Sequence, residues 1–185
     1  VGAGGGEFTY LSGKLGFNSE GIEPNVGYSN FAREEYGITI QTGHLADVCQ
    51  KFDLITMFHA LEHIPNPIKT FKLLYELLNN EGSLFIEVPN IETKDASPHN
   101  IYFKAHIHYF SAPTLTSAAS KYFDKIDEDI GSNLRILFKR KDTVEENLVY
   151  PSLEQINQSA RRLQEKGWVE YLIKVRGYKK LPLRI

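Results

Sequence analysis

The chain has little cysteine and no long apolar run, and each shortage excludes a class of protein. Its 185 residues include a single cysteine, Cys49, so a disulfide framework is excluded and no cysteine-based zinc site is expected. No apolar run approaches the roughly 20 residues that a membrane helix needs, and we expect no membrane span. The formal net charge is only −2, which is not typical of a nucleic-acid-binding chain.

What remains is the composition of an ordinary globular domain, with 42% hydrophobic and 24% charged residues. No signal peptide is recognised, so a cytoplasmic location is the default expectation. A homodimer is one oligomeric state that the composition allows. Val1 reads as the end of a buried strand followed at once by a glycine loop, and we expect upstream residues in the natural protein.

Apolar strand-like segments alternate with helical ones, which predicts βαβ units and a mainly parallel sheet. Residues 90–111 read as a long active-site loop. We divide the chain into a domain at 1–141 and a helical, basic extension at 142–185, in which 152–176 has the spacing of an amphipathic helix. The strands are expected at 19–23, 38–42, 52–58, 83–88 and twice within 122–140, and the helices at 7–16, 25–36, 67–79 and 113–121.

The first residues carry the pattern G-x-G-x-G at Gly2, Gly4 and Gly6, in which glycines allow a tight turn and a close approach to a ligand. Glu23 follows at the end of the next expected strand, where a carboxylate can accept both ribose hydroxyls of a nucleoside cofactor. Dinucleotide-binding loops usually read G-x-G-x-x-G and face a pyrophosphate. The shorter loop favours a cofactor without phosphate, such as S-adenosylmethionine (SAM).

With these features, residues 1–140 resemble class I SAM-dependent methyltransferases, in the branch with a Leu-Glu-His signature after the fourth strand, here Leu61-Glu62-His63. Leu77 to Asn90 is similar to the family's helix, turn and fifth strand, and His106 to Ser111 to its loop. The resemblance implies a Rossmann-like, seven-stranded, mainly parallel sheet with the last strand antiparallel, helices on both faces and a C-terminal amphipathic helix.

The resemblance also implies roles for individual residues. The three glycines would hold the methionine part of SAM, and Glu23, followed by Pro24, would hold the ribose. Gly43, His44 and Leu45 match the segment that passes the adenine, with backbone groups expected to contact the ring. Phe58 and His59 end the fourth strand, where ligands bind in open α/β sheets.

A metal ion is an alternative that His59-x-x-Glu62-His63 leaves open. Zinc peptidases with H-x-x-E-H carry it on one helix, whereas this pair of histidines straddles a strand end. Ubiquinone-pathway O-methyltransferases and small-RNA 2′-O-methyltransferases resemble this region but carry E-x-x-E-H or E-x-x-H-H and bind a divalent metal. We expect no bound metal here, and hydrogen bonds from Glu62 and His63 that order the turn before Pro65.

We therefore expect methyl transfer from SAM to O, N or C of a small molecule or a sugar or glycan metabolite, with S-adenosylhomocysteine (SAH) as the product. A base is often needed, and His106, His59 and His108 are the candidates, with His106 first. Tyr102 and Tyr109 would contact the acceptor. One alternative is an RNA or protein methyltransferase that uses the basic tail, where residues 161–185 hold eight Lys or Arg against two Glu. Another is a SAM-binding module without activity.

Overall fold

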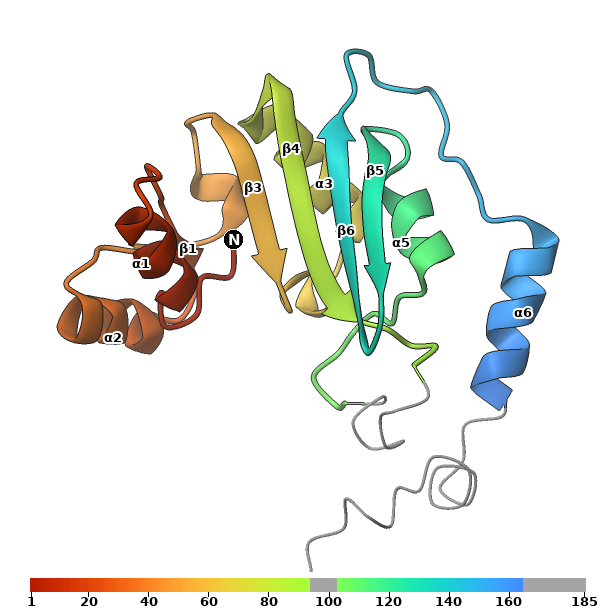
Figure 1. Ribbon diagram of the computed structural model, residues 1–185, viewed down its shortest axis with the longest axis horizontal. Coiled ribbons are helices and arrows are strands. Elements are labelled where there is room, and N and C mark those ends of the chain that lie inside the picture. Colours follow the sequence, from red (N-terminus) through yellow and green to blue (C-terminus); the bar gives the residue numbers. More distant parts are fainter. Residues whose placement is uncertain (94–102, 165–185) are drawn as a thin grey trace, which may run out of the picture.

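Residues 1–93 and 103–164, which the computed structural model describes, form a two-stranded and a four-stranded β-sheet (Figure 1). In the small sheet, β1 (Ile22–Glu23) pairs in parallel with β2 (Gln41–Thr42). The large sheet has the order β3-β4-β6-β5. Its strands are β3 (Phe52–Phe58), β4 (Leu78–Pro89), β5 (Phe123–Ile130) and β6 (Asn133–Arg140).

The expected single sheet of seven strands is wrong for the described residues, which carry six strands in two sheets. The segment between the sheets explains the difference. The Val1 nitrogen donates to the Thr56 carbonyl of β3 at 2.8 Å, and the Ala3 nitrogen donates to the Ile22 carbonyl of β1 at 3.0 Å. This segment is too short to form a ladder with either neighbour. The last strand, β6, is antiparallel to both β4 and β5, as the family resemblance implies.

Two helices flank the small sheet, α1 (Glu7–Lys14) and α2 (Val26–Tyr36). The side chain of Asn25 caps α2 by accepting from the Gly27 nitrogen at 2.8 Å, and Gly37 ends the helix in the left-handed conformation. Tyr10 and Tyr36 stack with their ring centroids 4.9 Å apart. These contacts tie α1 to α2 beside the glycine loop.

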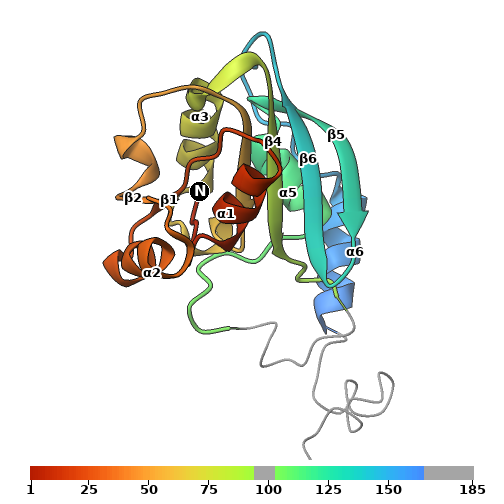
Figure 2. The same cartoon turned by 60° about the vertical axis from the view of Figure 1, so that its left-hand side comes forward.

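The main core lies between the large sheet and two helices that cover one of its faces, α3 (Pro67–Leu77) and α5 (Ala112–Ala119) (Figure 2). Asn66 caps α3 through the Lys69 nitrogen at 2.9 Å, with Pro67 in the first turn. Alternate strand residues point into this core, as a half-buried sheet requires. Fully buried side chains there include Phe71, Leu74, Leu84, Ile86, Leu115, Ile136 and Phe138.

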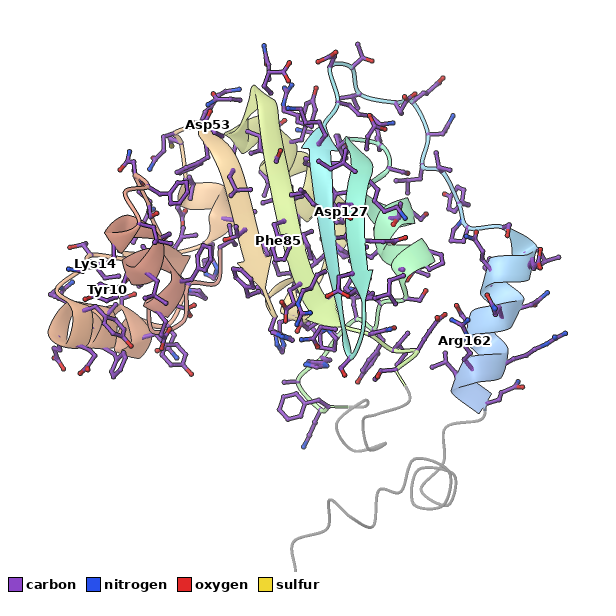
Figure 3. The ribbon with its side chains drawn as sticks, in the orientation of Figure 1. Tyr10, Lys14, Asp53, Phe85, Asp127 and Arg162 are labelled. Atoms are coloured by element: carbon purple, nitrogen blue, oxygen red, sulfur yellow. The ribbon has the colours of Figure 1, made fainter. Side chains whose placement is uncertain are left out.

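The opposite face of the large sheet carries a row of aromatic rings. Phe85 of β4 lies on this face (Figure 3), with its ring centroid 5.5 Å from that of Phe58 on β3. Phe8 of α1 packs 4.9 Å from Phe58. Helices therefore contact both faces of the large sheet. On the face that carries Phe85, the contact comes from α1 and lies at β3. The row joins α1 to the large sheet at the end of β3.

The last two strands form a hairpin that turns at Gly131, where the sequence predicts it. β5 is the edge of the sheet, and all of its residues after Phe123 are exposed. The segment after the hairpin leads to α6 (Leu153–Gln164), which contacts the body through hydrogen bonds from Ser159 and Arg162 to Glu92. Residues 165–185, with most of the basic tail, lie outside the described residues, and the boundary after residue 141 stays a prediction. Within the described ranges, no helix has the length and apolar character to cross a membrane.

Candidate functional site

The glycine loop is bonded to the carboxylate that the sequence pairs with it. Glu23 is 8% exposed, and its Oε2 accepts a hydrogen bond from the Gly4 nitrogen at 3.0 Å. Its Oε1 accepts from the Asn25 nitrogen at 3.0 Å. An ionised carboxylate has about four acceptor positions, so both oxygens can take further donors such as ribose hydroxyls.

The three loop glycines all have positive φ, between 53° and 89°, but they differ in their surroundings. A Cβ on Gly6 would lie 2.7 Å from Ile40 and 3.0 Å from Ala32, so packing under α2 requires glycine there. A Cβ on Gly2 would lie 2.8 Å from that of Ala60. A Cβ on Gly4 would have no atom within 4 Å, which leaves open space above the loop.

The segment expected to pass the adenine begins directly after β2. The Gly43 nitrogen donates to the Glu23 carbonyl at 3.1 Å, which brings this segment next to the ribose-binding candidate. His44 is exposed, and its nitrogen donates to Asp47 Oδ2 at 2.7 Å. Leu45, the first residue of η1 (Leu45–Asp47), is half-buried against the core. Asp47 is not among the site residues expected from the sequence, because its only signal there is a lone aspartate three residues after His44.

The carboxyl ends of β3 and β4 point toward the part of the molecule where residues 103–111 lie (Figure 1). His59 comes directly after β3 and has a φ of 48°, the only positive φ outside glycine in the described chain. Such a conformation costs about 1–2 kcal/mol for an ordinary residue, and it gathers at functional sites. The His59 nitrogen donates to the Glu87 carbonyl at 2.9 Å, which holds the residue in place.

The His59 side chain, 46% exposed, lies between two carboxylates. Its Nδ1 is 3.5 Å from Glu62 Oε1 and its Nε2 is 3.2 Å from Glu87 Oε1. The Glu62 carboxylate is the main cause that raises the pKa of His59 above its usual value, against burial and with help from Glu87. His59 therefore gains charge more readily than a free imidazole does.

Glu87 is held by β6. Arg135 Nε donates to its Oε2 at 2.8 Å, and Asn133 Nδ2 donates to its Oε1 at 2.6 Å. Burial acts to raise the pKa of Glu87, but these hydrogen bonds outweigh burial and hold that pKa below its usual value. Glu87 is not among the site residues expected from the sequence, although a charged residue in the apolar strand 83–88 was an available signal.

Glu62 lies in η2 (Leu61–His63), and its side chain is 1% exposed. The expected hydrogen bonds from donors of the turn to its carboxylate are absent, and neither oxygen has a hydrogen-bond partner among the described residues. Three imidazoles surround it instead. His63 Nε2 and His106 Nε2 each lie 4.0 Å from Glu62 Oε1, besides His59 at 3.5 Å.

His106 and His108 have different partners, although an extended segment would give them the same face. The chain turns at residues 104–105 and bends at 107. His106, 10% exposed, faces Glu62, and burial lowers its pKa below the usual value against the attraction of that carboxylate. His108 Nε2 instead lies 3.2 Å from the Pro65 carbonyl. The two imidazoles therefore contact different groups.

Of the two tyrosines expected to contact the acceptor, the structure describes only Tyr109. Tyr109 is 39% exposed; its hydroxyl donates to the Phe103 carbonyl at 3.1 Å, and its ring lies 6.0 Å from that of His106. Tyr102 lies outside the described residues. The structure thus brings His59, Glu62, His63 and His106 together with Tyr109 near them, whereas the His108 imidazole contacts the Pro65 carbonyl.

Residues 1–122 match a family model described as a methyltransferase domain. A ubiquinone biosynthesis O-methyltransferase of Actinobacillus pleuropneumoniae is 35% identical over 103 residues, covering 49% of this chain and 44% of that protein. The protein of the same name from Haemophilus ducreyi is 29% identical, with the same coverage. The chain spans less than half the length of these relatives.

Solved structures share the fold. A SAM-dependent methyltransferase of Thermotoga maritima, described as a possible histamine N-methyltransferase, superposes with a TM-score of 0.62 at 19% identity. It covers 76% of this chain and 80% of its own. An S-adenosylmethionine dependent methyltransferase of Mesorhizobium loti gives 0.63 at 15% identity, over 75% and 88% of the two chains. At these identities the likeness shows the Rossmann-like methyltransferase fold alone.

Proposed function

The chain belongs to the methyltransferase domain family, and we propose that it transfers a methyl group from SAM to a small-molecule acceptor. The observation that carries the proposal is the bond between Glu23 and the glycine loop. A buried carboxylate at a strand end, bonded to a loop with open space over Gly4, fits a nucleoside ligand that carries no phosphate.

Three parts of the site would hold SAM. Glu23 would accept the ribose hydroxyls, with Pro24 beside it, and the backbone of Gly2 and Gly4 would face the methionine part. The segment Gly43, His44 and Leu45 would lie along the adenine. The hydrogen bond from the Gly43 nitrogen to the Glu23 carbonyl supports this placement. The packing of Gly6 explains that glycine without a ligand, so Gly6 would shape the loop rather than contact SAM.

We propose a hydroxyl oxygen of a small molecule as the first acceptor to test, because the curated relatives are named O-methyltransferases. The polar groups at the ends of β3 and β4 support this choice, since a hydroxyl must lose its proton when it is methylated. The glycan acceptor stays within this proposal. The RNA or protein alternative depends on a basic tail that lies mostly outside the described residues, so it is an outcome of the test.

SAM, when bound, supplies an electrophilic methyl group and leaves as SAH. The protein must align the acceptor oxygen with that methyl group and remove the proton of the hydroxyl. His59 and His106 are the candidates for the proton acceptor, because both face the centre of the cluster. The lowered pKa of His106 keeps its imidazole neutral at neutral pH, as a base requires. Phe58, at the end of β3, would face the cofactor, and Tyr109 would contact the acceptor.

The proposal is tested by incubating the full-length protein with SAM labelled in the methyl group and with separate pools of small metabolites, glycans and RNA. We expect label in a small molecule and SAH in equal amount. Label in RNA or protein alone would replace the acceptor class. If SAH did not bind in calorimetry and no pool were labelled, the cofactor assignment would be wrong.

A further inference from the structure

Glu92, three residues beyond the end of β4, is a mostly buried carboxylate whose charge is met by a distant part of the chain. Its side chain is 10% exposed, and its oxygens accept hydrogen bonds from Ser159 Oγ and Arg162 Nη1 of α6. Ser159 and Arg162 are three positions apart, so they share one face of the helix. Arg162 lies on the side of α6 that faces the rest of the molecule (Figure 3). A carboxylate at this depth requires such a partner, because burial of an uncompensated charge is costly.

The helix that supplies these partners, α6, is not held by the apolar core. None of its residues is buried, and its apolar Leu153 and Ile156 are 73% and 49% exposed. The hydrophobic effect therefore contributes little to its position, and its polar contact with Glu92 matters more. The helix also lies beyond residues 1–122, which match the family model. It is thus an addition to the region that defines the family.

The backbone around Glu92 is bonded to the hairpin of β5 and β6. The Glu92 nitrogen donates to Asn90 Oδ1 at 2.9 Å, and Asn90 is 6% exposed. Asn90 Nδ2 donates to the Gly131 carbonyl at 3.0 Å, and the Asn90 nitrogen donates to the Ser132 carbonyl at 3.1 Å. Asn90 thus fixes the beginning of the turn 90–93, and the contact with α6 holds the turn at Glu92.

The same turn is bonded to the segment that carries the acceptor-side residues. The Ile91 nitrogen donates to the Phe110 carbonyl at 2.9 Å, and both residues are buried. Phe110 directly follows Tyr109, whose ring lies 6.0 Å from that of His106. A chain of contacts therefore leads from α6 through this turn to Tyr109 and His106.

We propose that Ser159 and Arg162 are positioning residues for the acceptor side of the site, and that they act by holding Glu92 and the turn 90–93. Both residues act through Glu92 and not on the reacting atoms. The proposal rests on the proposed methyl transfer, and it gives α6 a part in the binding of the acceptor.

The contact with α6 sets how much of the protein has its acceptor side correctly arranged. When the contact is broken, the turn can leave its place and shift the Phe110 backbone to which it is bonded. Only a fraction of the molecules then presents Tyr109 and His106 to the acceptor, whose apparent affinity falls by that fraction. Glu23 and the glycine loop are bonded to each other on other elements, so affinity for the cofactor should not change.

The first test is native-state amide hydrogen exchange on the full-length protein, which requires no acceptor. In Arg162→Met, the amide hydrogens of Ile91 and Glu92 should exchange roughly tenfold faster, as expected when one hydrogen bond to a charged group is lost. The amide hydrogens of Leu84 and Ile86, in the buried part of β4, should keep their wild-type rates. Arg161→Met is the matched control, because it removes a neighbouring, exposed arginine from the same helix.

The second test measures methyl transfer from labelled SAM to serial dilutions of the small-metabolite pool. Arg162→Met should raise the apparent KM for the pool by roughly tenfold and leave turnover at saturation unchanged. SAH affinity in calorimetry and stability in urea should stay at their wild-type values. Arg162→Lys, which keeps the charge, should recover part of the loss, and Arg161→Met should behave as the wild type.

A double-mutant cycle shows whether Glu92 and Arg162 act as one unit. Glu92→Gln keeps the size of the side chain and removes its charge. If the two residues act only through each other, the double variant should have the same KM as Arg162→Met alone. Rises in KM that simply add would contradict the proposal.

Unchanged exchange at Ile91, equal acceleration at Leu84 and Ile86, or an unchanged KM in Arg162→Met would each overturn the proposal. If SAH binds and the pool is labelled but Arg162→Met matches Arg161→Met, the positioning role fails and the methyltransferase proposal stands. If SAH does not bind and no pool is labelled, the proposed function fails and the role toward the acceptor falls with it. The exchange rates still decide in that case whether α6 holds the turn.

Discussion

Glu23 Oε2 lies 3.0 Å from the Gly4 nitrogen, so the carboxylate at the end of β1 is bonded to the loop that precedes α1. Replacement by alanine removes this bond, the bond from Asn25 and both proposed bonds to the ribose. Hydrogen bonds to charged groups are worth about 1.5–3 kcal/mol each, so Glu23→Ala should weaken SAH binding by at least about tenfold. Calorimetry measures the change, with Glu34→Ala on the exposed part of α2 as the control. Wild-type affinity in Glu23→Ala would refute the ribose assignment.

Gly4 and Gly6 should respond differently to alanine. Gly4→Ala meets no atom, so it should cost only the roughly 1–2 kcal/mol of a left-handed φ and should mainly weaken SAH binding. Gly6→Ala adds a clash with Ile40 and Ala32, and overpacking costs about 1–3 kcal/mol more. Urea denaturation compares the two with Gly13→Ala, a control in α1 where alanine meets nothing and should not destabilise. Equal losses of stability at Gly4 and Gly6 would contradict the packing argument.

The left-handed φ of His59 predicts a difference between two variants that both lack the imidazole. Asparagine tolerates this conformation, whereas valine is branched at Cβ and does not. His59→Val should therefore be less stable than His59→Asn by about 1–2 kcal/mol in urea denaturation. Two variants of the same stability would mean that the backbone at residue 59 relaxes without cost.

The pKa of Glu87 should depend on Arg135. In Arg135→Met the hydrogen bond to Glu87 Oε2 is lost, so the pKa of Glu87 should rise toward or above its usual value of 4.5. A carboxyl with a lowered pKa stabilises the fold above its unfolded pKa, and this stability is lost as pH falls through the folded pKa. The wild type should therefore exceed Arg135→Met in stability at neutral pH, and the gap should narrow below pH 4.5.

Carbon-detected NMR titration of the Glu87 carboxyl measures this pKa directly. Lys139→Met is the matched control, because Lys139 also lies on β6 but pairs with Glu81 at 2.9 Å. A pKa of Glu87 that moves equally in both variants would show a general charge effect and not the bond from Arg135.

His106→Ala should keep its affinity for SAH and lose methyl transfer. Removal of a group that handles the proton costs about 10²–10⁴-fold in turnover. Turnover at saturating acceptor and SAH affinity are measured on the same preparation, with His108→Ala as the control from the same loop. Turnover close to that of the wild type would remove His106 from the chemistry, and loss of SAH affinity would move it to the cofactor side.

The order of elements was predictable from the sequence, because the spacing of apolar residues within each segment does not depend on distant parts of the chain. The strand at 52–58 and the hairpin at Gly131 lie where they are expected. The end of the expected helix at 67–79 and the gap before the expected strand at 83–88 belong to β4 instead, since Phe52 pairs with Leu78 and Asn79 Nδ2 donates to Asp53 Oδ1 at 2.7 Å. Pairing with a neighbouring strand outweighed the turn propensity of asparagine and glycine.

The polar cluster was predictable only in part. The family resemblance names His59, Glu62 and His106 as site candidates. Their mutual distances depend on the bend at residues 104–107, where the sequence shows neither helical nor strand periodicity. The partners of Glu87 depend on the antiparallel register that sets it opposite Arg135 on β6. Register between strands far apart in the chain follows from the packed core, and one sequence read alone does not contain it.

The exposed outer strand β5 has a consequence for how the molecule behaves in crowded solution. A sheet edge offers unpaired backbone groups to any passing strand, and such edges seed fibrils. Five of the eight residues of this strand, Phe123–Ile130, are charged, four of them acidic. Two copies that met edge to edge would bring these like charges together without water between them. The charges on this strand therefore disfavour edge-to-edge pairing between copies, and neutralising its aspartates by mutation would remove that protection.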